Sequence, residues 1–273
     1  MRFFKNHKCE EITLIIYNNT QNLAASLPAT TLTHDTCGSE NSSEEQVICE
    51  HFILLRLNGE PLCRLSCTPS DLTELVIGRL FTEQLIKGTA DIDLIDICKN
   101  GNTAEIILKN PVSLKTSDAP EPTCCTANKQ FLALSKDKTL KKLPDVKPDS
   151  HIIFEMAAGL KKDTGLHRLT GGAHSCSIRF PDGTTQSFED VGRHNAIDKA
   201  VGCMLIREQN PADCMLFTTG RVSSDMAEKV ISAGIPVLIS KAVPTDKALI
   251  MAKEFGLRLF CRAWPDSYKQ FNI

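Results

Sequence analysis

The sequence predicts an α/β protein with a smaller α+β part on its N-terminal side, and three observations support this. Beyond residue 214, short apolar runs alternate with amphipathic segments, a pattern typical of parallel strands joined by helices. Residues 49–108 instead hold paired apolar runs around Asn-Gly turns, which favours hairpins. With 273 residues, 42% of them hydrophobic, the chain is long enough for one large or two small globular domains.

These patterns divide the chain into four segments. We expect residues 1–45 to be poorly ordered or irregular, because the stretch over 30–45 is polar and rich in turn formers. Residues 46–115 form the α+β subdomain. Residues 116–147 hold two adjacent cysteines among prolines and small polar residues, so we expect a mobile loop and linker there. Residues 148–273 form a ligand-binding α/β domain.

The elements of the N-terminal part follow from turn and helix signals. Apolar runs over 49–57 and 61–67 flank Asn58-Gly59, a strong hairpin signal. Residues 69–71 (Pro-Ser-Asp) introduce a helix over 71–86. Its apolar positions recur at helical spacing, and they are Leu72, Leu75, Val76 and Leu80. Two further strands, 92–98 and 103–108, flank a second turn.

In the C-terminal part, a helix over 155–160 precedes a Gly-Gly turn, two strands and the start of a helix within 169–199. Strands are then predicted at 214–218, 235–240 and 257–261, with helices at 225–233 and 246–256 between them. Ligands bind at the carboxyl ends of such parallel strands. These ends, 219–221, 241–244 and 262–264, carry basic side chains, which suits an anionic ligand.

Composition excludes several classes of function. The net charge of −2 gives no electrostatic basis for binding nucleic acid, and no apolar run is long enough to span a membrane. The N-terminus has no cleavable signal pattern. The 12 cysteines are scattered and form no CxxC pair, which indicates free thiols in a reducing cytoplasm and no structural metal site. The zinc-deaminase, dinucleotide, Walker and nucleophile-elbow motifs are all absent.

A polar cluster begins the helix within 189–199. Asp190 is placed to cap the helix, Arg193 to bind a phosphate, and His194 to pair with the carboxylate of Asp198 four residues later. The alternative is a solvated helix with surface ion pairs. Apolar residues on the other side of this helix weaken that alternative, because they turn the polar side toward a cleft.

Two glycine-containing segments are further candidates. Gly172 and His174 follow a Gly-Gly turn that permits close approach to a ligand, although a tight turn before a strand also explains it. Arg221 follows Gly220 at a helix start, where backbone amides bind anions or where serines simply cap the helix.

Cys124 and Cys125 lie in the loop between the two parts. A thiolate there is able to attack a persulfide on a second protein and carry the sulfur onward. Composition alone favours the other interpretation, an incidental cytosolic thiol, because surface cysteines are usually inert unless their pKa is lowered.

Several longer stretches identify a resemblance. They are NGEPL at 58–62, TGGAHS at 170–175, EDVGRHNAIDK at 189–199, TGRVSSDMAEK at 219–229 and GIPVLISKAVPT at 234–245. Together they resemble the formate dehydrogenase accessory sulfurtransferase family over residues 48–265.

The resemblance implies a cytidine-deaminase-like α/β/α sandwich without zinc chemistry, acting in the cytoplasm and often as a homodimer. It implies that sulfur comes from a cysteine desulfurase as a persulfide and goes to the molybdenum bis-molybdopterin guanine dinucleotide cofactor of formate dehydrogenase. It also implies cofactor contacts at the last strand, here Phe260, Cys261, Arg262, Ala263, Trp264 and Pro265. The candidates for ligand charge are Arg193, Arg221, Lys241 and Arg262.

One departure from the family leaves two functions open. Many members carry CGxCG in the loop, where this chain reads CCTAN, so either Cys124 or Cys125 matches the first cysteine and the second is missing. A single thiolate suffices for persulfide transfer. The alternative function is a chaperone that delivers the cofactor without sulfur transfer. A nucleotide-processing enzyme is a third, weaker hypothesis, because the zinc ligands are absent.

Overall fold

The C-terminal part of the molecule is built on a six-stranded sheet with the strand order β13-β12-β14-β15-β16-β17. The structure, a computed structural model, describes residues 2–5, 12–110, 115–116, 129–130, 132–133, 139–163 and 165–271. The strands of this sheet are β12 (His174–Arg179), β13 (Thr185–Asp190), β14 (Met215–Thr218), β15 (Val237–Ser240), β16 (Arg258–Cys261) and β17 (Lys269–Phe271). The central β14, β15 and β16 are parallel, as predicted, and antiparallel strands complete both edges.

Helices cover both faces of this sheet. Alternate residues of each strand point to opposite faces, so Leu216 of β14 packs with the buried side chains of α4 (Arg193–Ile206), α5 (Ser224–Ser232) and α6 (Asp246–Phe255). The next residue, Phe217, packs with α2 (Ser150–Asp163) on the other face. The predicted α/β layering is therefore present, and the finer likeness to cytidine deaminases stays a prediction.

The N-terminal part contains a seven-stranded sheet with the order β1-β2-β7-β8-β5-β6-β10. Its strands are β1 (Arg2–Lys5), β2 (Ile12–Asn18), β5 (His51–Leu57), β6 (Glu60–Cys67), β7 (Ile92–Ile97), β8 (Thr103–Leu108) and β10 (Lys129–Gln130). The predicted hairpin between β5 and β6 is confirmed, because Asn58 and Gly59 both adopt positive φ values of 49° and 87°. The remaining short elements of the N-terminal part and the linker are η1 (Thr89–Asp91), β9 (Lys115–Thr116) and β11 (Leu132–Ala133). Those of the C-terminal part are α3 (Gly165–Thr170) and η2 (Pro211–Asp213).

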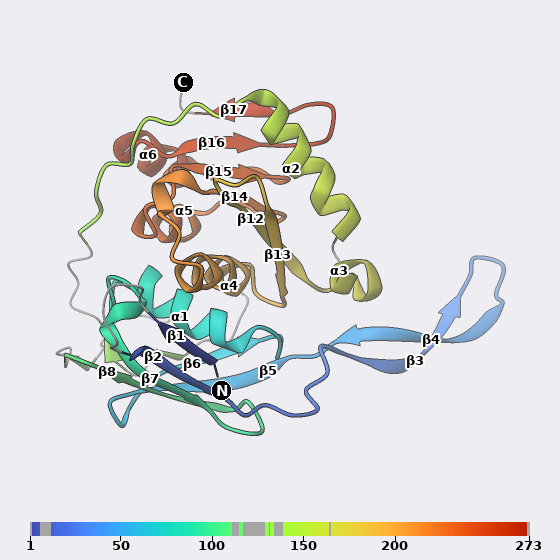
Figure 1. Ribbon diagram of the computed structural model, residues 1–273. Helices are drawn as coiled ribbons and strands as arrows, with labels where there is room; N and C mark the ends of the chain where they lie inside the picture. Colours follow the sequence, from blue (N-terminus) through green and yellow to red (C-terminus); the bar gives the residue numbers. More distant parts are fainter. Residues whose placement is uncertain are drawn as a thin grey trace.

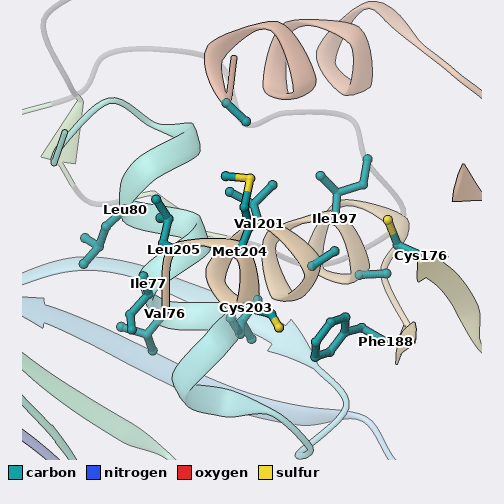
Figure 2. Packing of buried hydrophobic residues seen from close by; sticks show 14 of the residues in the cluster. Val76, Ile77, Leu80, Cys176, Phe188, Ile197, Val201, Cys203, Met204 and Leu205 are labelled. Carbon is teal, nitrogen blue, oxygen red and sulfur yellow. The ribbon is translucent and has the colours of Figure 1, made fainter. Parts of the chain in front are cut away.

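Helix α1 (Leu72–Thr82) joins the two parts by crossing α4 at close range (Figures 1 and 2). A Cβ atom added to Gly78 would lie 1.8 Å from the backbone oxygen of Asp198, and one added to Gly202 would lie 1.9 Å from that of Glu74. Glycines at both positions therefore let the backbones touch. Val76, Ile77 and Leu80 of α1 belong to the same buried cluster as residues of α4, which Figure 2 shows.

Residues 26–48 form a long hairpin that extends away from the rest of the molecule (Figure 1). Its strands are β3 (Ser26–His34) and β4 (Glu40–Ile48), and we call it the arm. The prediction of irregular chain over residues 1–45 is wrong for this stretch. The Asp35 carboxylate accepts the backbone N–H groups of Cys37 and Ser39 and closes the turn. The polar sequence indicated exposure to solvent, which threonine-rich paired strands also satisfy.

The domain boundaries at 45, 115 and 147 remain predictions. In the part of the chain that the structure describes, no helix has the length and apolarity to cross a bilayer.

Candidate functional site

A cavity of about 680 Å³ opens at the carboxyl ends of β14, β15 and β16, where the sequence placed the ligand site. Helix α2 and the segment over 167–174 form its opposite wall. The lining residues are Ala157, His167, Arg168, Gly171, Gly172, Ala173, His174, Phe217, Thr219, Lys241, Ala242, Ala263, Trp264 and Pro265. A cavity of this size suits a ligand of nucleotide size, because small-molecule sites typically span about 300–1,000 Å³.

The three loops that leave the parallel strands are bonded to one another. The backbone N–H of Val222 donates to the Val243 oxygen at 3.1 Å, and that of Arg262 donates to the Ala242 oxygen at 2.9 Å. The Ser240 hydroxyl donates to the Gly220 oxygen at 2.8 Å. These bonds fix the loops as one rigid edge, so the side chains on them keep their positions without a ligand.

The Gly-Gly turn forms one wall of the cavity. Gly171, with φ +66°, ends α3, and its N–H donates to the His167 oxygen at 2.8 Å. A Cβ atom on Gly172 would lie 2.9 Å from Cγ2 of Ile48, at the base of the arm. The first glycine therefore provides a helix end, and the second permits close contact with β4 behind the wall.

Two histidines face the cavity from this wall. His167 Nδ1 lies 2.6 Å from the Ala173 oxygen. The pKa of His174 is lowered from 6.5, first by burial and then by the positive charge of Arg193. His174 is therefore neutral at pH 7 and able to act as a hydrogen-bond donor or acceptor toward a ligand.

The cavity also carries two exposed cations and an aromatic ring. The Lys241 ammonium lies 4.9 Å from the centre of the Trp264 ring, and Arg168 lines the wall opposite the strand ends. In the described residues neither cation has a carboxylate within ion-pair distance. This positive lining suits an anion, as the sequence predicted.

The structure brings some of the predicted residues to the cavity and not others. Those that line it are Gly172, His174, Lys241, Ala263, Trp264 and Pro265. Phe260 and Cys261 are buried within β16, and Arg221 and Arg262 are exposed outside the lining. Asp190, Arg193 and His194 also lie outside it.

Asp190 is fully buried between the two parts of the molecule. One carboxylate oxygen lies 2.8 Å from Lys199 Nζ and accepts the Thr68 N–H at 3.0 Å. The other accepts the Gly192 N–H and the Asn195 amide at 2.8 and 2.9 Å. The predicted cap is wrong, because the N-cap of α4 is Gly192 with no side-chain cap. Protein groups surround the carboxylate, as a buried charge requires.

The predicted pairing of His194 with Asp198 is also wrong. His194 Nε2 lies 2.7 Å from the carboxylate of Asp225 at the start of α5, and this hydrogen bond lowers the pKa of Asp225. Asp198 instead accepts from Lys229 Nζ at 2.8 and 2.9 Å and from the Thr82 hydroxyl at 2.7 Å. Asp198 is buried, so it pairs with a buried cation from a neighbouring helix.

Arg193 lies between these buried contacts and the cavity. A Cβ atom on Gly220 would come 3.1 Å from the Arg193 Cβ, so the arginine packs against the β14 loop. Its Nε is buried and has no hydrogen-bond partner within the described residues. Its charge reaches His174, whose pKa it helps to lower. Arg193 therefore acts on the cavity through its charge.

Sequence reasoning missed several lining residues, notably Ala157, His167, Arg168 and Phe217. His167 and Arg168 directly precede the Gly-Gly turn, which is a usable signal, whereas only packing brings Ala157 to the site. Cys124 and Cys125 lie outside the described residues. Within those residues, no group of three or more His, Cys, Asp or Glu side chains is arranged to hold a metal ion.

Comparison with known proteins adds independent findings. The proteins named sulfur carrier protein FdhD from Shouchella clausii and Geobacillus kaustophilus are each 32% identical over 221 and 220 residues, covering 78% of this chain and 83% of theirs. The protein of that name from Sulfolobus acidocaldarius is 29% identical over 225 residues, covering 81% of this chain and 87% of its own.

A crystal structure from Desulfotalea psychrophila, described as a formate dehydrogenase accessory protein, has a similar fold. It superposes with a TM-score of 0.75 at 25% identity, covering 92% of this chain and 98% of that one. The model of the FdhD/NarQ family matches residues 48–273, which include every lining residue of the cavity. The chain therefore belongs to the FdhD/NarQ family.

Proposed function

We propose that this protein is a cytoplasmic sulfurtransferase that accepts sulfur from a cysteine desulfurase as a persulfide. It passes the sulfur to the molybdenum bis-molybdopterin guanine dinucleotide cofactor, which serves formate dehydrogenase. The relatives named sulfur carriers support the sulfur part of the proposal. The observation that carries the ligand part is the cavity with unpaired cations at the ends of β14, β15 and β16.

The cavity suits one guanine nucleotide portion of such a ligand. Its volume of about 680 Å³ falls within the range for nucleotide-sized ligands. Lys241 and Arg168 supply positive charge for a pyrophosphate, and Trp264 supplies an aromatic face for a base. His174, neutral at pH 7, adds a hydrogen-bonding group without adding charge. The residues present therefore fit the nucleotide end of the substrate.

The chemistry of the buried thiols narrows the choice of sulfur carrier. Burial raises the pKa of Cys63, Cys203 and Cys214 to about 11 and that of Cys261 to about 12. The pKa values of Cys67 and Cys176 are raised further. These thiols stay protonated at neutral pH, and the thiolate is the nucleophile. Burial therefore disfavours these six thiols as carriers, and the resemblance of the loop to the family's cysteine motif favours Cys124 or Cys125.

The first transfer step is a thiol–persulfide exchange. The loop thiolate attacks the outer sulfur of the desulfurase persulfide, a new S–S bond forms on the carrier, and the desulfurase cysteine leaves as a thiolate. The second step releases the outer sulfur at the oxidation level of sulfide. It needs two electrons, which a small-molecule thiol of the reducing cytoplasm supplies as it forms a mixed disulfide with the carrier cysteine.

The sulfur transfer is tested by intact mass spectrometry after incubation with a cysteine desulfurase and cysteine. Wild type is expected to gain the mass of one sulfur atom, and either Cys124→Ala or Cys125→Ala is expected to lose that gain. Cys37→Ala is the matched control, because Cys37 is exposed on the arm and is expected to have no effect.

A binding measurement on the same samples distinguishes sulfur transfer from delivery of the cofactor without sulfur transfer. GDP binding, measured by calorimetry, is expected to be equal in wild type and both loop variants. Wild type that gains no sulfur yet binds GDP would contradict the carrier mechanism and support a chaperone that delivers the cofactor.

A further inference from the structure

Helix α3 presents His167 and Arg168 to the cavity, yet none of its own side chains is buried. It has 6 residues, and isolated helices shorter than about 12–15 residues are marginal in water. A short helix without buried side chains needs contacts from other elements to keep its place. Those contacts therefore decide whether two polar side chains of the cavity stay in position.

The carboxylate of Glu189 in β13 holds the start of α3, which lies beside that strand (Figure 1). Its Oε2 accepts the backbone N–H of Leu166 at 2.7 Å, and its Oε1 accepts that of His167 at 2.8 Å. The first N–H groups of a helix have no acceptor within the helix, and a negative charge at this end also complements the helix dipole. Hydrogen bonds to an ionised acceptor are stronger than those between neutral groups. Glu189 therefore attaches α3 to the sheet.

Glu189 is itself fixed by buried groups. The hydroxyl of Ser175, its partner on β12, donates to Oε1 at 3.2 Å. The Nζ of Lys199 donates to the backbone oxygen of Glu189 at 3.0 Å, and Ser175 and Lys199 are both fully buried. A side chain supported in this way keeps its geometry and is able to hold a second element precisely.

The other contacts of α3 differ in kind. The Thr170 hydroxyl donates to the Leu166 oxygen at 2.8 Å, and His167 Nδ1 lies 2.6 Å from the Ala173 oxygen. These bonds join residues of the segment 165–173 to one another, so they set its internal shape. The contact with the base of the arm, where Ile48 lies against Gly172, is apolar and has no fixed direction. Glu189 thus supplies directional bonds from outside the segment.

We propose that Glu189 is a positioning residue of the cavity, which acts on the ligand through Arg168 and His167. Glu189 does not line the cavity, so its effect on binding passes through α3. Without the carboxylate, the start of α3 loses the acceptor of two N–H groups, and the wall separates from the sheet with its cation. The effect on ligand affinity rests on the proposed function, whereas the attachment of α3 does not.

The next residue, Asp190, has a separate task on the other face of β13. Side chains of neighbouring strand residues point to opposite faces. Asp190 points to the side of α4, where it accepts the Thr68 N–H at 3.0 Å and the Asn195 amide at 2.9 Å. A change at Glu189 is therefore expected to affect α3 and to leave the contact with the N-terminal part in place.

The first test is hydrogen–deuterium exchange of the ligand-free protein, followed by mass spectrometry of peptides within 165–173. Glu189→Ala is expected to speed the exchange of the Leu166 and His167 amides at least about tenfold. Glu189→Gln keeps one acceptor oxygen without the charge, so it is expected to lie between Glu189→Ala and wild type.

The matched control is Glu105→Ala in the N-terminal sheet. Glu105 is also half-buried, and its Oε1 accepts the Gly59 N–H at 2.7 Å. This variant also removes a carboxylate that accepts a backbone N–H group. It is expected to leave both the exchange within 165–173 and the affinity for GDP unchanged.

The second test is a double-mutant cycle on GDP affinity, measured by calorimetry. Glu189→Ala and Arg168→Ala are each expected to weaken GDP binding about tenfold. Because Glu189 acts through α3, adding Glu189→Ala to Arg168→Ala is expected to weaken binding by only about threefold or less. A purely structural role gives no such coupling between the two residues.

Three results would overturn the proposal. The first is unchanged exchange within 165–173 in Glu189→Ala. The second is GDP affinity that Glu189→Ala leaves as in wild type, or that Glu105→Ala lowers equally. The third is a double variant about a hundredfold weaker than wild type, since independent effects multiply. A wild type that binds no GDP would instead contradict the ligand part of the proposed function, and the exchange result would then decide whether Glu189 holds α3.

Discussion

Polar side chains differ in their partners between two regions, the contact of α1 with α4 and the cavity at the strand ends. At and beside the helix contact, Asp198 of α4 and Asp190 of β13 are buried, and protein donors surround each carboxylate. At the cavity, Lys241 and Arg168 are exposed and have no protein partner of opposite charge among the described residues. Polar residues with saturated contacts hold the fold together, whereas polar residues left unpaired at a concave surface are available to a ligand.

The strongest test of this contrast removes the buried cation at the helix contact. Lys229→Met leaves the Asp198 carboxylate with Thr82 and with Arg79 at 3.9 Å, so we expect a loss of about 3 kcal/mol in unfolding free energy. Lys253→Met, on the exposed face of α6, is the control and is expected to have little effect. Chemical denaturation measures both.

Removing the charges of both Asp198 and Lys229 tests the same pair more directly. Asp198→Leu combined with Lys229→Met is expected to recover much of the loss, because an apolar pair avoids the cost of a buried lone charge. A double variant as unstable as the sum of both single variants would show that the pair has no such coupling.

A methyl group at the helix crossing is expected to have the next largest effect. Gly202→Ala places a Cβ atom 1.9 Å from the Glu74 oxygen, so the helices must separate, and we expect a loss of about 3 kcal/mol. Gly159→Ala in α2 meets nothing within 4 Å and is expected to stabilise the protein by about 0.5–1 kcal/mol. Equal melting temperatures for the two variants would contradict the close crossing.

At the cavity, a substitution is expected to change ligand affinity and to leave the unfolding free energy unchanged. Lys241→Ala removes a cation from the lining, so GDP affinity is expected to fall about tenfold while the unfolding free energy stays unchanged. Lys253→Ala is the matched control. Calorimetry measures the affinity. A variant that loses stability instead of affinity would place Lys241 with the structural residues.

The smallest expected effect is the pH dependence that His174 contributes. Its pKa is below 6.5 in the folded state, so between that lower value and pH 6.5 the unfolded chain binds more protons. Stability is therefore expected to fall as the pH drops through this window, and His174→Gln is expected to flatten the decline. Denaturation at a series of pH values tests it, and an unchanged slope would contradict it.

Local patterns predicted much of the fold correctly. The strands beside the Asn58-Gly59 turn and those after residue 214 were predicted correctly. Local backbone preference and short-range periodicity determine where such strands form, and both can be read from the sequence. The arm was not predicted, because a polar sequence indicates exposure to solvent but does not indicate whether two strands pair with each other. The helix predicted over 71–86 ends at Thr82, after which Gln84 adopts a φ of +59°.

The candidate site was predicted only in part. Lys241, Ala263 and Trp264 were found because strand ends can be located from sequence and ligands bind there. The cluster over 189–199 was assigned to a cleft, yet most of it is buried against α1 and α5. A polar helix start has the same sequence whether its partners are protein groups or a ligand.

The sequence by itself determined the order of strands and helices, the parallel character of the central sheet and the family to which the chain belongs, because these depend on local preference and on matching motifs. Only the tertiary structure decided which charges are saturated, which glycines touch a neighbouring backbone and where the arm extends. The physical reason is that burial and pairing depend on groups far apart in the chain, as Asp198 and Thr82 show.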